Sequence, residues 1–230
     1  MSLILQIETA TTVCSVALAE DGKMLACKEV EQRNIHAEKI TVFIGEILNE
    51  AGKSYDALDA IAVSTGPGSY TGLRIGVSTA KGLSFALDKP LIPVDTLAAM
   101  ADGFKLQDGT VVTSHVLLCP MIDARRMEVF TAVFDVHGSV VRPVSAEIID
   151  ENSFSDLLKS HQIVFFGDGA EKCREVLGIH DNAHVINGFT NSAMHLTKRA
   201  NEKYLKKEFV DVAYFEPYYL KDFIAGKKSS

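Results

Sequence analysis

The order of predicted strands and helices constrains the fold of this chain most strongly, because one order occurs twice. Apolar runs or alternation indicate strands, and apolar positions three and four residues apart indicate helices. The first half contains three strands, a helix, a strand and a helix, at residues 3–7, 13–19, 23–30, 34–51, 59–65 and 73–87. The second half contains the same series at residues 116–122, 127–136, 140–149, 153–161 and 163–166, with a last helix that follows Gly-Asp-Gly at 167–169 and runs through residue 177. A strand at 91–94 and a helix from Thr96 follow the first series, and an amphipathic helix at about 192–207 follows the second.

Short polar motifs mark several ends of these elements. Asp21-Gly22 predicts a two-residue hairpin turn, because both central positions of such a turn need a positive φ. Asn34 is expected to open the first helix, and Gly52 to follow its last turn. Ser153 is the expected N-cap of the short helix in the second half.

Two copies of this series predict an α/β fold with two lobes. Three strands in antiparallel order followed by crossover helices give a mixed sheet covered by helices. Two such βββαβα lobes back to back describe the architecture shared by actin, the sugar kinases and the Hsp70 ATPase (the ASKHA fold). We place the lobes at residues 1–104 and 105–230, with the last helix a candidate to pack back on the first lobe.

The charge balance argues against a free-standing nucleic-acid-binding protein. The 230 residues carry a formal net charge of -7, and the sequence pI is about 5.5. Phosphate neutralisation normally requires a basic surface. The lysine-rich spots are Lys206-Lys207 and Lys227-Lys228, and two adjacent lysines are usually a solvated surface. If RNA is a ligand, a partner must supply most of the contact.

Neither export nor a membrane anchor is indicated by the sequence. The four cysteines are scattered without a Cys-x-x-Cys pair, which is typical of reduced thiols rather than of disulfides or a zinc site. No apolar run approaches the roughly 20 residues of a membrane span. The first residues lead into a strand pattern without the charged region of a signal peptide. The expected location is the cytoplasm, with no membrane partner.

The most specific stretch is glycine-rich and lies between a predicted strand and a predicted helix. It reads Ser-Thr-Gly-Pro-Gly-Ser-Tyr-Thr-Gly-Leu-Arg-Ile-Gly at residues 64–76. Backbone N–H groups at such a helix start can hold an anion. However, Thr71 stands where a P-loop or a dinucleotide fingerprint requires glycine, and no Lys-Ser/Thr pair follows. The residues alone favour a tight turn whose glycines provide positive φ and close packing.

This stretch closely resembles the signature of the TsaB family, whose members are paralogues of the threonylcarbamoyl-transferase subunit TsaD. The resemblance continues through residues 7–10 (Ile-Glu-Thr-Ala), 80–83 (Ala-Lys-Gly-Leu), 122–130 (Ile-Asp-Ala-Arg-Arg-Met-Glu-Val-Phe) and 216–221 (Glu-Pro-Tyr-Tyr-Leu-Lys). The last motif departs from the family, which usually ends it in arginine. The match spans nearly the whole chain and is strongest over residues 60–100.

The resemblance implies a non-catalytic dimerisation subunit, required for threonylcarbamoyl transfer to the adenosine next to the anticodon of tRNA. It implies a heterodimer with a TsaD-like subunit, and a TsaE-like ATPase in the full complex. The chain alone is expected to form a homodimer. Contact with tRNA is expected only through the complex.

Departures from the TsaD pattern imply that this chain has no catalytic and no metal-binding residues. TsaD-like proteins follow the corresponding helix with a His-x-x-x-His metal pair. When the chains are aligned through residues 92–94, these histidines fall on Thr96 and Met100, and a third ligand, an aspartate, falls near Thr190. Threonine and methionine are not credible ligands for such a metal. The metal-dependent step is therefore not expected here.

The alternative function is an ATP-dependent phosphotransferase or a nucleotide-binding protein of the actin-like class. Such enzymes need an Asp-x-Gly turn after the first strand of each lobe, so that phosphate and Mg²⁺ can approach the backbone. Residues 8–10 (Glu-Thr-Ala) and 123–125 (Asp-Ala-Arg) stand there without either glycine, while residues 167–170 (Gly-Asp-Gly-Ala) are a candidate remnant of an adenosine-binding turn. A peptidase is the third class, but the sequence contains neither a His-Glu-x-x-His nor a Gly-x-Ser-x-Gly motif.

Residual nucleotide binding stays open beside the loss of activity. No cofactor is expected, except ATP or ADP at a subunit boundary. The candidate vestigial nucleotide or anion loop comprises Glu8, Thr9, Gly66, Gly68, Ser69, Thr71 and Gly72.

The second long helix has two apolar faces, which predicts a covered surface beyond its own sheet. One face carries Leu73, Val77, Ala80, Leu83 and Leu87, and the other carries mostly small groups. A helix at the edge of a monomer needs only one apolar face. The second face is therefore either a partner interface or buried between two layers of its own domain. The predicted interface, with the first helix included, comprises His36, Phe43, Ile47, Ile75, Thr79, Gly82 and Ala86.

Overall fold

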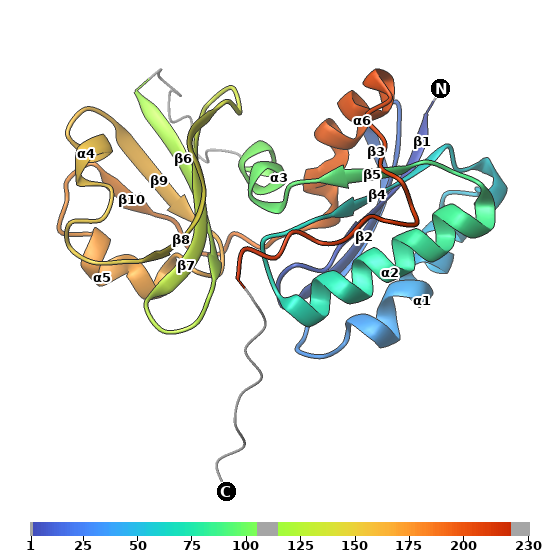
Figure 1. Ribbon diagram of the computed structural model, residues 1–230, viewed down its shortest axis with the longest axis horizontal. Helices are drawn as coiled ribbons and strands as arrows, with labels where there is room; N and C mark the ends of the chain where they lie inside the picture. Colours follow the sequence, from blue (N-terminus) through green and yellow to red (C-terminus); the bar gives the residue numbers. More distant parts are fainter. Residues whose placement is uncertain (1, 105–114, 222–230) are drawn as a thin grey trace, which may run out of the picture.

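The computed structural model describes residues 2–104 and 115–221, which form two lobes (Figure 1). The first half of the chain comprises β1 (Leu3–Glu8), β2 (Val13–Glu20), β3 (Lys23–Glu31), α1 (His36–Glu50), η1 (Tyr55–Ala57), β4 (Ala60–Ser64), α2 (Tyr70–Leu87), β5 (Leu91–Val94) and α3 (Thr96–Gly103). The second half comprises β6 (Val116–Asp123), β7 (Glu128–Asp135), β8 (Val140–Ile148), α4 (Ser155–Leu158), β9 (Gln162–Phe166), η2 (Glu171–Cys173), α5 (Arg174–Leu177), β10 (Ala183–Val185), η3 (Ala193–Leu196) and α6 (Thr197–Lys206). Lys227-Lys228 lie outside the described residues.

Each lobe is built on a five-stranded sheet, and the two sheets have the same strand order. The orders are β3-β2-β1-β4-β5 and β8-β7-β6-β9-β10. In the first sheet β1 pairs antiparallel with β2 and parallel with β4. In the second sheet β6 pairs antiparallel with β7 and parallel with β9. The predicted pair of lobes with mixed sheets is confirmed.

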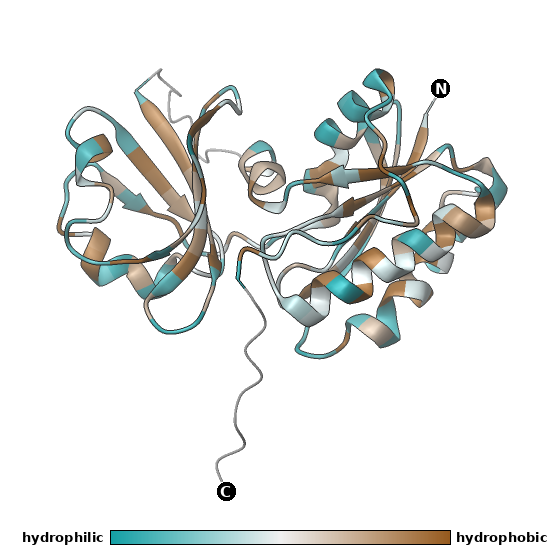
Figure 2. Cartoon of the chain, in the orientation of Figure 1, coloured by the Kyte–Doolittle hydropathy of each residue, from teal (hydrophilic) through white to brown (hydrophobic). Residues whose placement is uncertain are grey.

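Strand β1 is buried on both faces, because helices cover both sides of the first sheet. Its residues alternate between the faces: Leu5 and Ile7 belong to the core under α1 and α2, and Ile4 packs with α6. The strands form the hydrophobic interior of each lobe (Figure 2). Gln6 and Glu8 are the polar exceptions on the α6 side of β1, and both are fully buried.

Two helices cross from one half of the chain to the sheet of the other half. Helix α3 follows the first sheet but packs its Leu97 and Met100 against Phe134 and Phe166 of the second, and it lies between the lobes in Figure 1. Helix α6 follows the second sheet, and its Ala200 packs against the first. Each sheet is therefore completed by a helix from the other half. None of the described helices is long and apolar enough to cross a membrane.

The segment after α6, residues 209–221, runs back across the first lobe to the second, and we call it the C-terminal strap. The Nζ of Lys81 on α2 donates to two strap carbonyl oxygens at 3.2 and 2.8 Å. A strap backbone N–H donates to the carbonyl oxygen of Thr65 at 2.7 Å. At its end, the Lys221 side chain pairs with Glu128 of the second lobe. The strap therefore links α2, the glycine-rich loop and β7.

Three predicted helix ends need correction, although the hairpin turn at Asp21-Gly22 is confirmed by φ values of 49° and 74°. Helix α1 begins at His36 rather than at Asn34, whose φ of 61° is not helical. Helix α2 begins three residues earlier than predicted, because Ser69 caps it. Ser153 does not cap α4; its hydroxyl oxygen accepts the N–H of Asp150 at 2.9 Å.

Candidate functional site

The glycine-rich loop between β4 and α2 packs directly against the turn that follows β1. Gly66 has a φ of 113°, a conformation that favours glycine. A Cβ atom at Gly68 would lie 2.5 Å from the carbonyl oxygen of Ala10, and one at Gly72 would lie 2.1 Å from that of Thr9. Backbone conformation thus requires the first of these three glycines, and close approach to the turn requires the other two.

Three backbone donors of this loop, those of Gly66, Ser69 and Gly72, are engaged within the protein. The N–H of Ser69 donates to the Ala10 carbonyl oxygen at 2.7 Å. The N–H groups of Gly66 and Gly72 donate to the hydroxyl oxygens of Thr96 and Ser69, at 3.1 and 3.2 Å. An anion would have to displace these bonds. In this conformation the predicted anion loop is a packed turn, and one of its members, Thr71, is exposed on α2.

Glu8 is a fully buried carboxyl group at the end of β1, beside this loop. Its Oε1 accepts hydrogen bonds from the Ala10 N–H at 2.6 Å and from the Ser64 hydroxyl at 2.9 Å. Burial raises the pKa of Glu8 to about 7, and these hydrogen bonds oppose the rise. Glu8 therefore exchanges its proton near neutral pH without facing solvent.

The second lobe repeats the arrangement at the end of β6. Gly167 has a φ of 106°, and a Cβ atom there would lie 2.3 Å from the carbonyl oxygen of Met121. Asp168 Oδ1 accepts the N–H of Asp123 at 3.0 Å, and Lys172 pairs with the Asp123 carboxylate. The turn that suggested an adenosine site is therefore also packed on its neighbouring strand.

The two positions aligned with the histidine ligands of TsaD lie inside packed structure. Thr96 and Met100 are both fully buried. The Thr96 hydroxyl already accepts a hydrogen bond from the Gly66 N–H, and Met100 belongs to the apolar core between α3 and the second sheet. These donors do not fit a hard or borderline metal ion. Thr190, near the third aligned position, is exposed, and the described residues contain no group of three His, Cys, Asp or Glu that could hold a metal ion.

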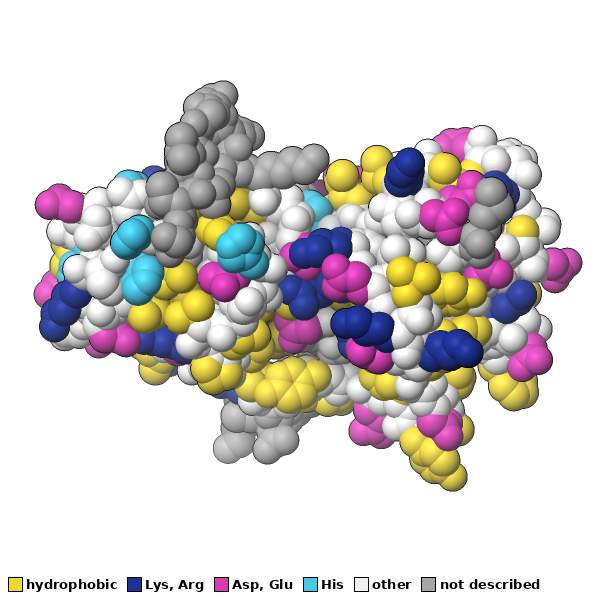
Figure 3. Space-filling model, turned by 90° about the horizontal axis from the view of Figure 1, so that it is seen from above, with side chains coloured by type: hydrophobic (Ala, Val, Ile, Leu, Met, Phe, Trp, Pro, Cys, Tyr) yellow, Lys and Arg dark blue, Asp and Glu magenta, His cyan; other side chains and the backbone are white. Residues whose placement is uncertain are grey.

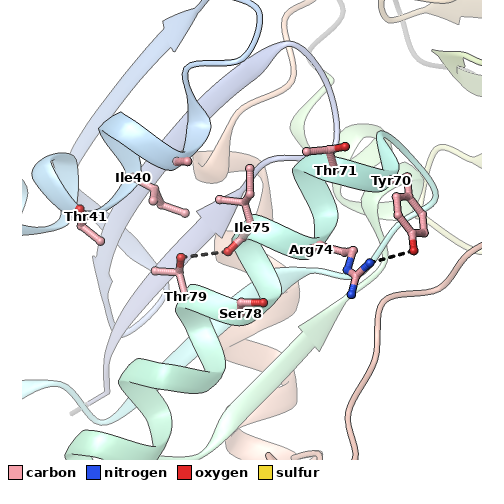
Figure 4. A pocket seen from close by; sticks show the side chains of 9 residues that line it. Ile40, Thr41, Tyr70, Thr71, Arg74, Ile75, Ser78 and Thr79 are labelled. Carbon is pink, nitrogen blue, oxygen red and sulfur yellow. Dashed lines mark hydrogen bonds between the residues drawn. The ribbon is translucent and has the colours of Figure 1, made fainter. Parts of the chain in front are cut away.

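Helices α1 and α2 line an open groove of about 480 Å³ (Figure 4). Its lining residues are Ala37, Ile40, Thr41, Tyr70, Thr71, Arg74, Ile75, Ser78 and Thr79. Ile75 and Thr79 are half-buried, and the stripe that they start continues along α2 to Gly82 and Ala86, which are exposed. A Cβ atom added at Gly82 would meet nothing within 4 Å. The second apolar face of α2 is therefore open in the isolated chain rather than buried between its own layers.

The structure corrects the α1 part of the predicted interface. Ile47 is fully buried in the first-lobe core, and His36 is 6% exposed with its Nε2 3.1 Å from the Val13 carbonyl oxygen. The apolar arc of α1 is broad because its own sheet covers it. Ile47 and His36 are therefore not available to a partner. Phe43 is half-buried at the edge of that core.

An exposed aromatic residue on α2 is missing from the sequence-based set. Phe85 is 84% exposed, although phenylalanine is usually buried. It lies one turn beyond Gly82, so an extension of the stripe along the helical wheel would have included it. On α1, Val42 is 46% exposed. The outward sides of both helices therefore carry uncovered apolar groups.

Two mixed sheets with one strand order, each with the loop after its fourth strand packed on the end of its first, define an actin-like (ASKHA) protein. The family model of the tRNA N6-adenosine threonylcarbamoyltransferase TsaD matches residues 29–225. The chain is 33% identical to the tRNA threonylcarbamoyladenosine biosynthesis protein TsaB of Escherichia coli, over 98% of this chain and 97% of that protein. It belongs to the TsaB family.

Other relatives agree with this assignment. The TsaB protein of Haemophilus influenzae is 30% identical, over 98% of this chain and 96% of that protein. The solved structure of YeaZ from Pseudomonas aeruginosa has a TM-score of 0.80 and 27% identity, over 96% of this chain and all of that one. The resemblance stated from the sequence is thereby confirmed.

Proposed function

We propose that this chain is a non-catalytic, cytoplasmic subunit that pairs with a TsaD-like protein, and that the pair makes threonylcarbamoyladenosine in tRNA. Similarity to TsaB proteins over nearly their whole length supports the pathway. The observation that carries the non-catalytic role is the burial of Thr96 and Met100 at the positions aligned with metal ligands of the paralogue. Neither side chain can supply the ligand that the transfer step would need.

The role is tested by reconstitution from purified proteins. The chain, supplied with threonylcarbamoyl-adenylate, tRNA and divalent metal, should leave the tRNA unmodified, because Thr96 and Met100 stand where the paralogue has metal ligands. Addition of the TsaD-like partner should produce the modified nucleoside, detected by mass spectrometry of digested tRNA. The partner alone is the matched control. Metal-dependent product formed by the chain alone would contradict the proposal.

The surface proposed for the partner is the stripe of α2 beside the groove. Ile75, Thr79, Gly82, Ala86 and Phe85 are apolar or small, and small groups let another helix backbone come close. A helix whose outward face is apolar is normally covered. The same surface would serve a second copy when the partner is absent, and a TsaE-like ATPase would join the assembled pair.

Gly82→Arg should give a folded, soluble chain whose affinity for the TsaD-like partner is lower on the order of tenfold or more. The fold should tolerate the change because the space around Gly82 is open. The interface should not, because a long charged side chain would hold the two helices apart. Affinity is measured by calorimetry and folding by circular dichroism.

Glu202→Arg, an exposed site on α6, is the matched control and should bind like the wild type. Unchanged partner affinity of folded Gly82→Arg would place the interface elsewhere on the chain.

Contact with tRNA is assigned to the complex rather than to this chain alone. The net charge of -7 supports this assignment. On the face shown in Figure 3, lysine and arginine side chains are interspersed with aspartate and glutamate rather than gathered into one basic field. The described residues of this face therefore present no extended basic surface to RNA.

A further inference from the structure

An open stack of aromatic and guanidinium groups lies where the C-terminal strap crosses the start of α2. The rings of Tyr219 and Tyr70 have centroids 4.8 Å apart at an interplanar angle of 36°. The guanidinium carbon of Arg74 lies 5.3 Å from the centre of the Tyr70 ring, and Arg74 donates to the Tyr70 hydroxyl at 2.9 Å, as Figure 4 shows. Tyr218 and Tyr219 are 49% and 36% exposed. We call Tyr70, Arg74 and Tyr219 the tyrosine platform.

Two adjacent arginines stand on the second lobe beside the end of the strap. Arg125 and Arg126 form the turn between β6 and β7 and are both exposed. Their φ values of 73° and 47° are unfavourable for arginine. Glu128, two residues later, pairs with Lys221 of the strap. Because Lys221 is only two residues beyond Tyr219, this pair brings the arginine turn close to the tyrosine platform.

The cations of this surface are free to meet an anion, although the exposed carboxylate of Glu216 on the strap acts on Tyr219. In the described ranges 2–104 and 115–221, no carboxylate pairs with Arg74, Arg125 or Arg126. The neighbouring carboxylates of Asp123 and Glu128 each already have a lysine partner. The surface therefore combines aromatic faces with unpaired guanidinium groups, across both lobes.

We propose that this surface contacts single-stranded RNA, with a base stacked on the tyrosine platform and phosphates held by Arg125 and Arg126. Proteins recognise unpaired RNA by stacking bases on aromatic and arginine planes and by pairing phosphates with cations. Arg125 and Arg126 have no carboxylate partner in the described ranges, and an RNA backbone supplies the complementary charge. The proposal rests on the proposed function and deepens it: the substrate tRNA touches this chain directly, and only a few contacts are available for it. Weak binding by the isolated chain follows from that small number.

The test uses the assembled complex carrying Arg125→Gly and Arg126→Gly. Glycine removes both charges and accepts positive φ, so the turn should keep its conformation. The Kd of the complex for tRNA should rise about tenfold, and the slope of log affinity against log salt should shrink by about 1.4, roughly 0.7 per lost phosphate contact. The KM for tRNA should rise with the Kd, while kcat at saturating tRNA stays the same.

Lys206→Ala with Lys207→Gly is the matched control, because it also removes two adjacent exposed cations, one of them at a positive φ of 57°. This control should bind tRNA like the wild type. Tyr219→Ala should also weaken tRNA binding, whereas Tyr219→Phe should not, because stacking needs the ring and not the hydroxyl group.

Unchanged tRNA affinity in the double-glycine and Tyr219→Ala complexes would overturn the proposal. Lower affinity for the TsaD-like partner with unchanged tRNA affinity would overturn it too, and would identify a protein contact. Because tRNA binding is measured directly, the result is separate from the proposed function, which fails if the wild-type complex does not modify tRNA.

Discussion

The free energy of unfolding should fall by about 3 kcal/mol because of Glu8 alone as the pH rises from below 4.5 to above 7. The pKa of Glu8 is about 7 in the folded protein, compared with 4.5 for an exposed glutamate such as Glu8 in the unfolded chain. Below the lower value Glu8 is protonated in both states, so nothing is lost. Between the two values the unfolded chain releases the proton while the folded chain keeps it. Above both values the folded state holds a buried charge, and the loss is complete.

Glu8→Gln should remove this pH-dependent loss, because an amide of the same shape carries no charge at any pH. The measurement is urea unfolding of both proteins from about pH 5 to about pH 8.5. Burial also raises the pKa of Asp95 and of Asp168, but both groups are present in both proteins and cancel in the difference. Glu202→Gln, an exposed change on α6, should keep the wild-type pH dependence. If the free energy of unfolding of Glu8→Gln and of the wild type changes equally with pH, ionisation of Glu8 does not destabilise the folded state.

Gly72→Ala should destabilise the fold by about 3 kcal/mol, enough to lower the yield of folded protein. The added methyl group would lie 2.1 Å from the carbonyl oxygen of Thr9, which is backbone and cannot rotate away. The turn after β1 would have to move away from the start of α2. Thermal and urea unfolding measure the loss.

The same substitution at the other end of the helix provides the matched control. Gly82→Ala should raise stability by up to about 1 kcal/mol, because alanine is the better helix former and its methyl group meets nothing within 4 Å. If Gly72→Ala lowers the free energy of unfolding and Gly82→Ala raises it, the loss at Gly72 comes from close packing and not from helix propensity. A tolerated Gly72→Ala would mean that the glycine-rich loop is free to shift away from Thr9.

The repeated element order could be predicted because each strand and helix carries its own apolar period. The start of α2 could not be predicted, because the glycines before residue 73 suit a turn as well as a helix. Only the structure shows that the Ser69 hydroxyl caps the helix by accepting the Gly72 N–H. The interface prediction was wrong for Ile47, because a broad apolar arc on a helix does not say whether its own sheet or a partner covers it. Glu8 had a signal, a carboxyl group in an otherwise apolar strand, but only burial shows that its proton is retained near neutral pH.

The position of α3 could not be predicted from the sequence for a similar reason, whereas the last helix was a candidate to pack on the first lobe, as α6 does. The pattern of α3 shows that it is buried nearly all round, with Leu97 and Met100 on one side and Ala99 on another. An apolar pattern gives the width of a buried face but not the identity of the sheet that it meets. The arrangement of these two helices is therefore a property of the assembled pair of lobes.

The exchange of α3 and α6 between the two halves of the chain affects how the protein folds during its synthesis on the ribosome. Domains generally fold as units in the order in which they emerge, but here the α6 face of β1, around Ile4, is covered only when Leu196 and Ala200 arrive. Likewise, Leu97 and Met100 of α3 are covered only when the second sheet has formed. The two lobes therefore cannot complete their folding one after the other, because the amino-terminal half lacks part of its core until α6 has been synthesised.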